Sequence, residues 1–322
     1  GVSWFLQNSP FELPTTYLSA FECFKFRLSR FQDEFNPDIL AELKDFLFDK
    51  SIEIVPNLPP NAVFELCNAQ TYLSILIFPE YVPDLFDLIF QYPDHIKFRF
   101  LAAFCEYIIL PTPKNVDKIN TIKSFLAENN FYEAILTQIQ GGIQQKIPDS
   151  INALASFIRW SVDLSYLNED LISDIFTDTS DVIAMSVLKM ITSIAQRGMP
   201  EEQKDAFIEA MQIYSHIEYY CQNYSENFDI ISACAEATSI LGYSMSKPLP
   251  ELYNLLCIFF DQTEEISGKV IGCFRTFVRN NPESSDEVSV KVVERMVAYI
   301  TNNPLTAFNR YLNLLFLLLK EC

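Results

Sequence analysis

Side chains that could support chemistry are sparse in this sequence of 322 residues. It holds two histidines, His95 and His216, and neither has another His or a Cys at the short spacing of a zinc site. Both are expected at the surface of helices. The sequence contains no glycine-rich phosphate-binding loop and no Gly-x-Ser-x-Gly turn for a nucleophile. We therefore predict that the protein is not an enzyme and has no metal site and no cofactor.

One group of charged residues is regular enough to form a surface. Acids between residues 37 and 54 recur at intervals of four, three, four and four residues, which places them on one face of a helix. Phe46 and Leu47 lie opposite, and Lys44 and Lys50 are expected off this face. We call these acids the acidic stripe: Asp38, Glu42, Asp45, Asp49 and Glu53.

A shorter acidic pair, Asp84 and Asp87, follows on the next short helix. Two interpretations stay open for these acids: a solvated face of a soluble protein, or a docking surface for a basic partner. The net charge of −19 favours basic partners and opposes direct contact with phosphate backbones. Basic residues are scattered and flanked by acids, so this segment alone is not expected to bind nucleic acid.

Helices must position these side chains. Apolar residues recur at intervals of three and four residues along the chain, and breaks rich in Pro, Asn and Asp separate the runs. Asn36-Pro37 is a strong helix start, with a capping residue followed by proline. The long segment 115–146 is expected to be interrupted at Asn129-Asn130 and to fray at Gly141-Gly142. Seven glycines leave little room for the turns of an all-β fold.

Paired helices that recur about every 40 residues predict an all-α fold, a right-handed α-solenoid of HEAT-type helix pairs. We expect one such array over residues 1–322, as the amino-terminal part of a longer protein. The 28 phenylalanines supply bulky core side chains for stacked helix layers. The expected pairs cover about 16–54, 61–92, 94–146, 148–177, 180–218, 225–261 and 263–301, with a last helix at about 304–320.

Six of the eight cysteines are expected to pack as small hydrophobes. Eight occur without a Cys-x-x-Cys motif, and most lie inside apolar helical runs, where a free thiol behaves as a small hydrophobe. This usage fits a reducing compartment. The longest apolar run, 314–319, is far too short to span a bilayer, so no membrane insertion is expected. The cysteines in apolar runs are Cys23, Cys67, Cys105, Cys234, Cys257 and Cys273.

Several segments resemble HEAT units of the exportins, in the importin-β (karyopherin) family. Segment 156–167, SFIRWSVDLSYL, is similar in its aromatic, Trp and Asp-Leu-Ser pattern. The turn Arg197-Gly198-Met199, followed by Lys204, resembles that of the tRNA exportins. Weaker similarities follow the same order along the chain, at 21–26, 67–76 and 270–275.

The resemblance implies a nuclear transport receptor that shuttles between nucleus and cytoplasm as a monomer. Such a receptor binds the GTP form of the small GTPase Ran through its amino-terminal HEAT units, and it contacts nucleoporins. It would carry tRNA, recognised by shape and backbone and mainly through the full-length protein. We place the Ran contact on Asp38, Glu42, Asp45, Asp49, Asp84 and Asp87. The alternatives are another karyopherin, either a protein exportin or an importin, and a HEAT scaffold that does not bind Ran.

Overall fold

The computed structural model is helical wherever it has regular secondary structure among the residues that it describes, which confirms the predicted all-α class. The expected helix at 304–320 and most of the second helix of the pair 263–301 lie outside these residues. The chain divides into two compact units, Gly1–Leu164 and Ser165–Cys322. The described residues are 14–30, 35–109, 115–161, 165–167, 169–176, 180–197, 200–244, 250–260 and 262–280, and the single positions 290, 293, 294, 297, 301, 312 and 316.

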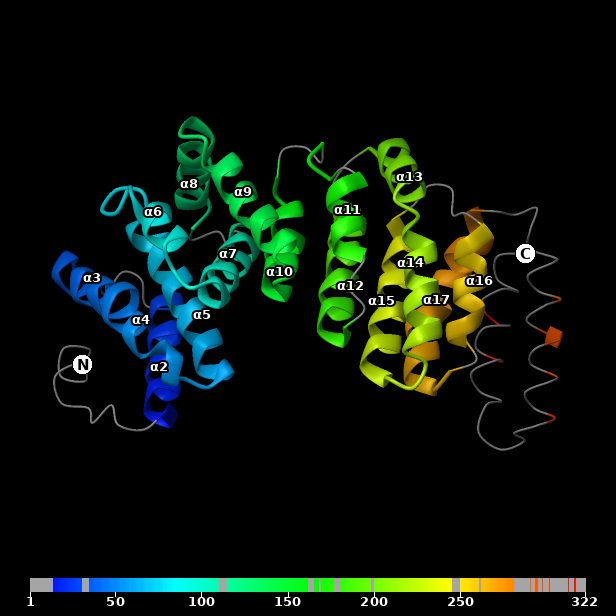
Figure 1. The fold of residues 1–322 in the computed structure, drawn as a ribbon. Coiled ribbons are helices and arrows are strands. Elements are labelled where there is room, and N and C mark those ends of the chain that lie inside the picture. The colour runs from blue at the N-terminus through cyan, green and yellow to red at the C-terminus, as the bar shows by residue number, and fades with distance from the viewer. Residues whose placement is uncertain are drawn as a thin grey trace. The chain divides into compact units, whose positions relative to one another are not determined.

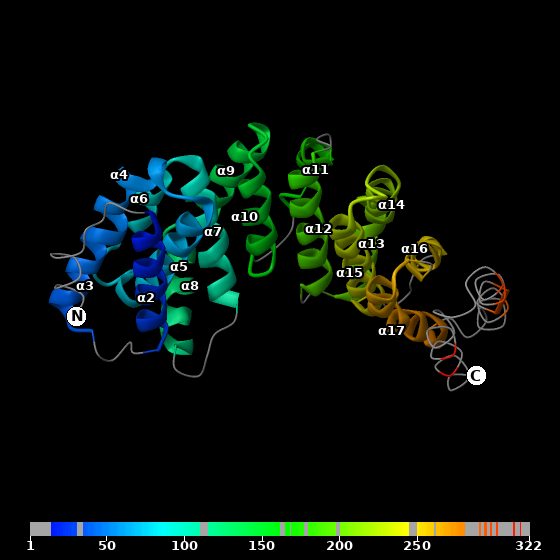
Figure 2. The same ribbon diagram turned by 90° about the horizontal axis from the view of Figure 1, so that it is seen from below.

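A row of adjacent helices forms the first unit. Helices α2, α5, α7 and α10 pack side by side in this order, and the remaining helices lie against the row (Figures 1 and 2). Helix α5 is buried on most sides because apolar residues surround its axis. The elements are α2 (Pro14–Arg30), α3 (Pro37–Lys44), the π-helical turn η2 (Asp45–Lys50), α4 (Ser51–Ile54), η3 (Val55–Asn57), α5 (Pro60–Ile77), α6 (Leu85–Phe90), α7 (Asp94–Ile109), α8 (Val116–Glu128), α9 (Phe131–Gln144) and α10 (Pro148–Ile158).

Local signals set several of these helix boundaries. The Asn36 side chain accepts a hydrogen bond of 2.9 Å from the Ile39 amide, and Pro37 occupies the first turn, so the predicted start of α3 is confirmed. The predicted interruption at Asn129-Asn130 is also confirmed, because Asn130 adopts a left-handed conformation between α8 and α9.

The expected fraying at Gly141-Gly142 is wrong. Helix α9 continues through both glycines, and Gly142 is buried where α9 meets α7 and α10. A Cβ atom at Gly142 would lie 2.3 Å from Phe98 Cζ and 2.6 Å from Ser150 Cβ. This glycine therefore serves the close approach of three helices.

Aromatic rings connect the helices of the first unit. The Phe86 ring makes edge contacts with Phe78 at 5.4 Å and with Phe104 at 5.2 Å between centroids. The Trp160 ring, just after α10, lies 4.7 Å from Tyr132 on α9. The phenylalanines thus fill the space between helices, as their number predicts.

A shorter row builds the second unit. Helices α12, α15 and α17 pack side by side, while α14 and α16 pack on α15 (Figure 1). The second half of the pair expected over 180–218 consists of two helices, because the left-handed residue Gln212 lies between them. The elements are α11 (Glu169–Phe176), α12 (Asp181–Gln196), α13 (Glu201–Ala210), α14 (Ile213–Asn223), α15 (Phe228–Ser244), α16 (Pro250–Phe260) and α17 (Glu264–Asn280).

Lys204 has a structural role in the second unit, whereas Gly198 and Met199 of the noted turn lie outside the described residues. Lys204 on α13 is buried, and its ammonium donates a hydrogen bond of 2.9 Å to the carbonyl of Ala195. That carbonyl belongs to the last turn of α12, where a cation is favoured by the helix dipole. Lys204 therefore links the start of α13 to the end of α12.

The cysteines lie mostly in the core. Cys23 is exposed, so the expectation for this residue is wrong. Burial raises the pKa of Cys67 and that of Cys273 to about 12. Such thiols remain protonated at neutral pH. The buried cysteines are Cys67, Cys105, Cys221, Cys234, Cys257 and Cys273.

Candidate partner-binding surface

The segment that carries the acidic stripe is not one continuous α-helix. It passes from α3 into the π-helical turn η2 and then into α4, which corrects the expected uniform helix over residues 37–54. In η2, the three consecutive residues Phe46, Leu47 and Phe48 are buried. The wider turn changes the positions of the side chains relative to those in an α-helix, and π-helical turns are frequent at functional sites.

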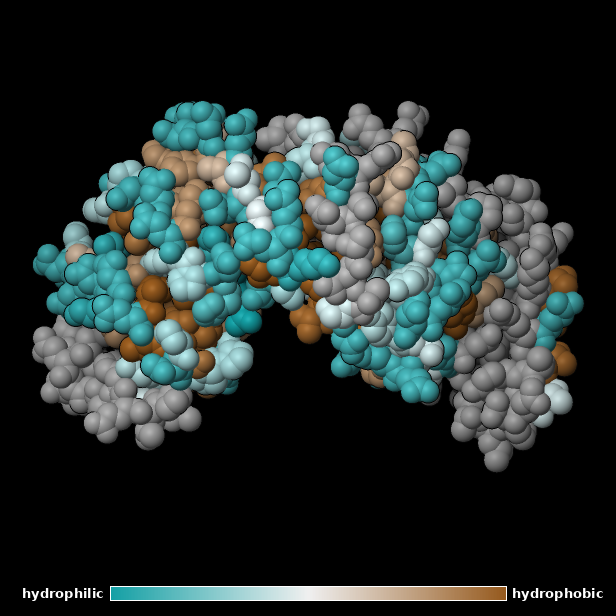
Figure 3. Space-filling model, viewed as in Figure 1, coloured by the Kyte–Doolittle hydropathy of each residue, from teal (hydrophilic) through white to brown (hydrophobic). Residues whose placement is uncertain are grey.

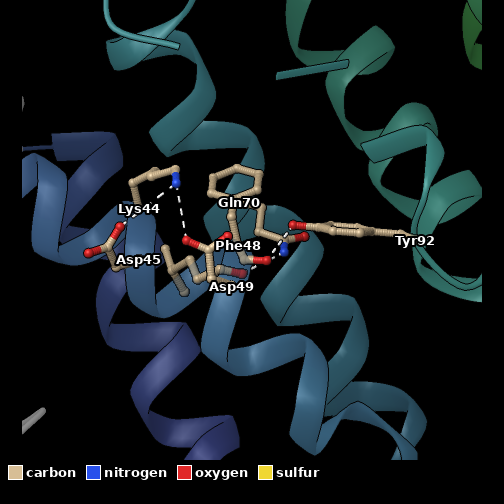
Figure 4. A network of polar contacts seen from close by, with 7 residues as sticks. Lys44, Asp45, Phe48, Asp49, Gln70 and Tyr92 are labelled. Carbon is tan, nitrogen blue, oxygen red and sulfur yellow. Dashed lines mark hydrogen bonds and ion pairs between the residues drawn. The ribbon is translucent and has the colours of Figure 1, made fainter. Parts of the chain in front are cut away.

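Two side chains from other helices stabilise the π-helical turn. The Gln70 amide on α5 donates a hydrogen bond of 2.7 Å to the Leu47 carbonyl, and the Tyr92 hydroxyl, which follows α6, donates to the Phe48 carbonyl (Figure 4). Burial raises the pKa of Tyr92, so its hydroxyl stays protonated and acts as the donor. These bonds satisfy buried carbonyl groups of the turn.

Replacing Tyr92 with phenylalanine should therefore lower the free energy of unfolding by about 1–2 kcal/mol, because the buried Phe48 carbonyl loses this donor. Urea denaturation followed by circular dichroism measures the change. Tyr81→Phe is the matched control, since Tyr81 is 61% exposed. Equal stability of the two variants would show that the Tyr92 bond does not hold the turn.

Four acids of the stripe reach the surface together. Asp38, Glu42, Asp45 and Asp49 are all exposed, and hydrophilic residues gather over α3 in the view of Figure 3. Glu53 on α4 is also exposed. The structure thus places the predicted stripe on solvent-accessible positions, outside the row of α2, α5, α7 and α10.

Lys44 does not lie off the stripe as expected. Its ammonium is 3.1 Å from Asp49 Oδ2 and 3.8 Å from Asp45 Oδ1 (Figure 4). The π-helical turn explains the difference, because five residues complete about one turn there and bring Lys44 and Asp49 to the same side. This exposed pairing adds at most about 1 kcal/mol of stability, but it neutralises part of the stripe.

The second acidic pair lies near the first group. A groove of about 390 Å³ separates α3 from the turn that follows α5, and Asp84 lines it on the side opposite α3. Asp87 is exposed one turn further along, on α6. Sequence reasoning missed the groove, which is lined by Pro37, Leu40, Ala41, Lys44, Ile77, Tyr81, Val82 and Asp84.

Two basic residues of α7 pair with acids. The Lys97 ammonium is 2.8 Å from Asp94, and the Arg99 guanidinium is 2.9 Å from Asp149, across α7 and α10. These pairs leave no extended basic surface along α7.

The two histidines lie in different surroundings. His95 is exposed as expected, whereas His216 is half-buried and its ring stacks on Phe176 with centroids 3.5 Å apart. Burial lowers the pKa of His216. The second histidine is thus a packing residue of the second unit.

Comparison with protein-family models and with curated proteins finds no match to this chain. Among the described residues, no helix is long and apolar enough to cross a membrane. The same part of the chain contains no cluster of three or more His, Cys, Asp or Glu side chains arranged for a metal ion. The acidic stripe, with its exposed carboxylates, and the adjacent groove are the candidate site.

Proposed function

We propose that this chain is the amino-terminal part of a nuclear transport receptor most similar to the tRNA exportins. In this proposal the helix pairs form a right-handed HEAT-type α-solenoid, and the protein binds Ran in its GTP form. The observation that supports it best is the packing of adjacent helices in rows, α2 to α10 in one unit and α12 to α17 in the other. Stacked helix pairs of this kind present extended surfaces to macromolecular partners.

The acidic stripe is the proposed Ran contact. Its exposed carboxylates would attract a basic patch and accelerate encounter with it. Lys44 reduces the negative charge near Asp45 and Asp49. In this proposal Asp38 and Glu42 therefore contribute most of the attraction to a basic patch. Asp84 and Asp87 would extend the contact beyond the groove.

The remaining partners follow from the same proposal. Cargo tRNA would be held mainly by the full-length protein, because the acidic surface of this chain repels its backbone. Binding of Ran-GTP and cargo would be coupled, which means that each raises the affinity for the other by the same factor. The receptor would contact nucleoporins and shuttle between nucleus and cytoplasm as a monomer.

Capture by immobilised Ran tests the proposal. The chain and a longer form of the protein are each mixed with Ran loaded with a non-hydrolysable GTP analogue or with GDP. We expect at least tenfold more capture by the GTP form, which corresponds to about 1.4 kcal/mol. Equal capture by both forms, in the longer protein as well, would reject the exportin assignment and favour a HEAT scaffold that does not bind Ran.

A further inference from the structure

The groove beside α3 has an apolar lining. Leu40 and Val82 are half-buried in its wall, and Tyr81 exposes 61% of its surface there. Its volume of about 390 Å³ can hold one or two apolar side chains of a ligand. An exposed aromatic ring at the edge of an apolar groove is a common anchor in protein recognition.

Carboxylates border this groove on both sides. Along α3, the lining residues and the acids of the stripe follow each other in sequence, as in Ala41-Glu42 and Lys44-Asp45. Successive residues of an α-helix are about 100° apart, so the acids run beside the lining as a parallel rim. Asp84 lies on the opposite side of the groove.

The single cation in the lining does not reverse this charge. The Lys44 ammonium is held by Asp49 at 3.1 Å and lies 3.8 Å from Asp45, so two carboxylates already offset it. Carboxylates therefore outnumber cations along the borders of the apolar groove. Close approach of a second cation is favourable here, and approach of an anion is not.

We propose that this groove binds a short segment of a partner protein in which one or two apolar side chains are flanked by lysine or arginine. The apolar groups would enter the space beside Leu40 and Tyr81, and the cations would face the acidic rims. The inference goes beyond the proposed function, because it requires no Ran and applies to any partner with such a segment. The charge argues against RNA and anionic lipid surfaces. It also argues against a second copy of this chain, which has a net charge of −19.

A labelled peptide tests this proposal. The probe is a fluorescein-labelled dodecapeptide with two leucines three positions apart and two lysines on each side, and fluorescence anisotropy measures its binding to the chain. Replacing both leucines with serine, or all lysines with glutamate, should each weaken binding at least tenfold. Raising the salt concentration should weaken binding of the original peptide. Binding that tolerates both replacements, or no binding at all, would overturn the proposal.

A matched pair of variants locates the binding. Ala41→Arg places a cation and extra volume at an exposed position of the groove lining, whereas Ala127→Arg makes the same change at an exposed position of α8. We expect the first to weaken peptide binding at least tenfold and the second to change it less than twofold. Circular dichroism checks that both variants keep their helices.

Two further measurements distinguish peptide binding in the groove from binding elsewhere on the chain. Tyr81→Ala removes an exposed ring of the lining, so it should also weaken binding while the fold is retained. Equal effects of Ala41→Arg and Ala127→Arg would place the peptide elsewhere and reject the groove. The Ran capture experiment is run in parallel. Peptide binding without a preference for Ran-GTP rejects only the transport proposal, whereas a preference for Ran-GTP without peptide binding rejects only the groove.

Discussion

Replacement of Gly142 with alanine is expected to lower the stability of the first unit by about 1–3 kcal/mol. The new Cβ would lie 2.3 Å from Phe98 Cζ and 2.6 Å from Ser150 Cβ, well inside van der Waals contact. Phe98 and Ser150 are both buried, on α7 and α10, so neither can move without disturbing the helix packing. Urea denaturation monitored by tryptophan fluorescence measures the loss, because Trp160 contacts Tyr132 on α9.

The adjacent glycine provides the matched control. Nothing lies within 4 Å of a Cβ built at Gly141, although both residues are in the same helix turn of α9. Gly141→Ala should therefore raise stability by about 0.5–1 kcal/mol, since alanine is the better helix former. Two substitutions of identical chemistry are thus expected to have opposite signs. A common sign would contradict the close approach of α9 to α7 and α10.

Reversal of Asp38, Glu42 and Asp45 to lysine should weaken binding to Ran-GTP at least tenfold if the proposed function holds. The three acids are exposed, so the substitutions remove attraction to a basic partner without altering the core. The salt dependence of binding should decrease as well, because fewer charge pairs form across the interface. Biolayer interferometry at several salt concentrations measures both effects.

The control for this variant reverses three exposed acids on other helices of the same unit: Asp117, Glu128 and Glu133. It produces the same change in net charge on α8 and α9, neither of which contributes a residue to the groove lining. Circular dichroism should show unchanged helicity for both variants. If both lose affinity equally, net charge alone explains the binding, and if neither does, the stripe is only a solvated face.

Signals within a few residues predicted the fold well. Asn36-Pro37 starts α3 and Asn129-Asn130 separates α8 from α9, because a capping side chain and a left-handed turn depend on local sequence. The all-α class followed from apolar spacing, which the burial of α5 and α10 reflects. These features require no knowledge of distant contacts.

Features that depend on residues far apart in the sequence could not be predicted from local patterns. The π-helical turn η2 needs hydrogen-bond donors from Gln70 and Tyr92, which lie 23 and 44 residues beyond the carbonyls that accept from them. Two adjacent glycines predict the end of a helix. The contact that requires Gly142 is made by α7 and α10, which are distant in the sequence. The groove likewise lies between α3 and a turn more than thirty residues later in the sequence. The spacing of acids along one helix therefore predicts only its acidic rim.

The buried cysteines make the two units separately observable. A thiol-specific alkylating reagent reaches a buried sulfur atom only while the surrounding helices are transiently apart, so its rate reports the equilibrium of that local opening. Cys67 and Cys105 report on the first unit, and exposed Cys23 supplies the unprotected rate. Mass spectrometry of the labelled peptides can thus compare the opening of the two units in one unmodified sample. The reporters in the second unit are Cys221, Cys234, Cys257 and Cys273.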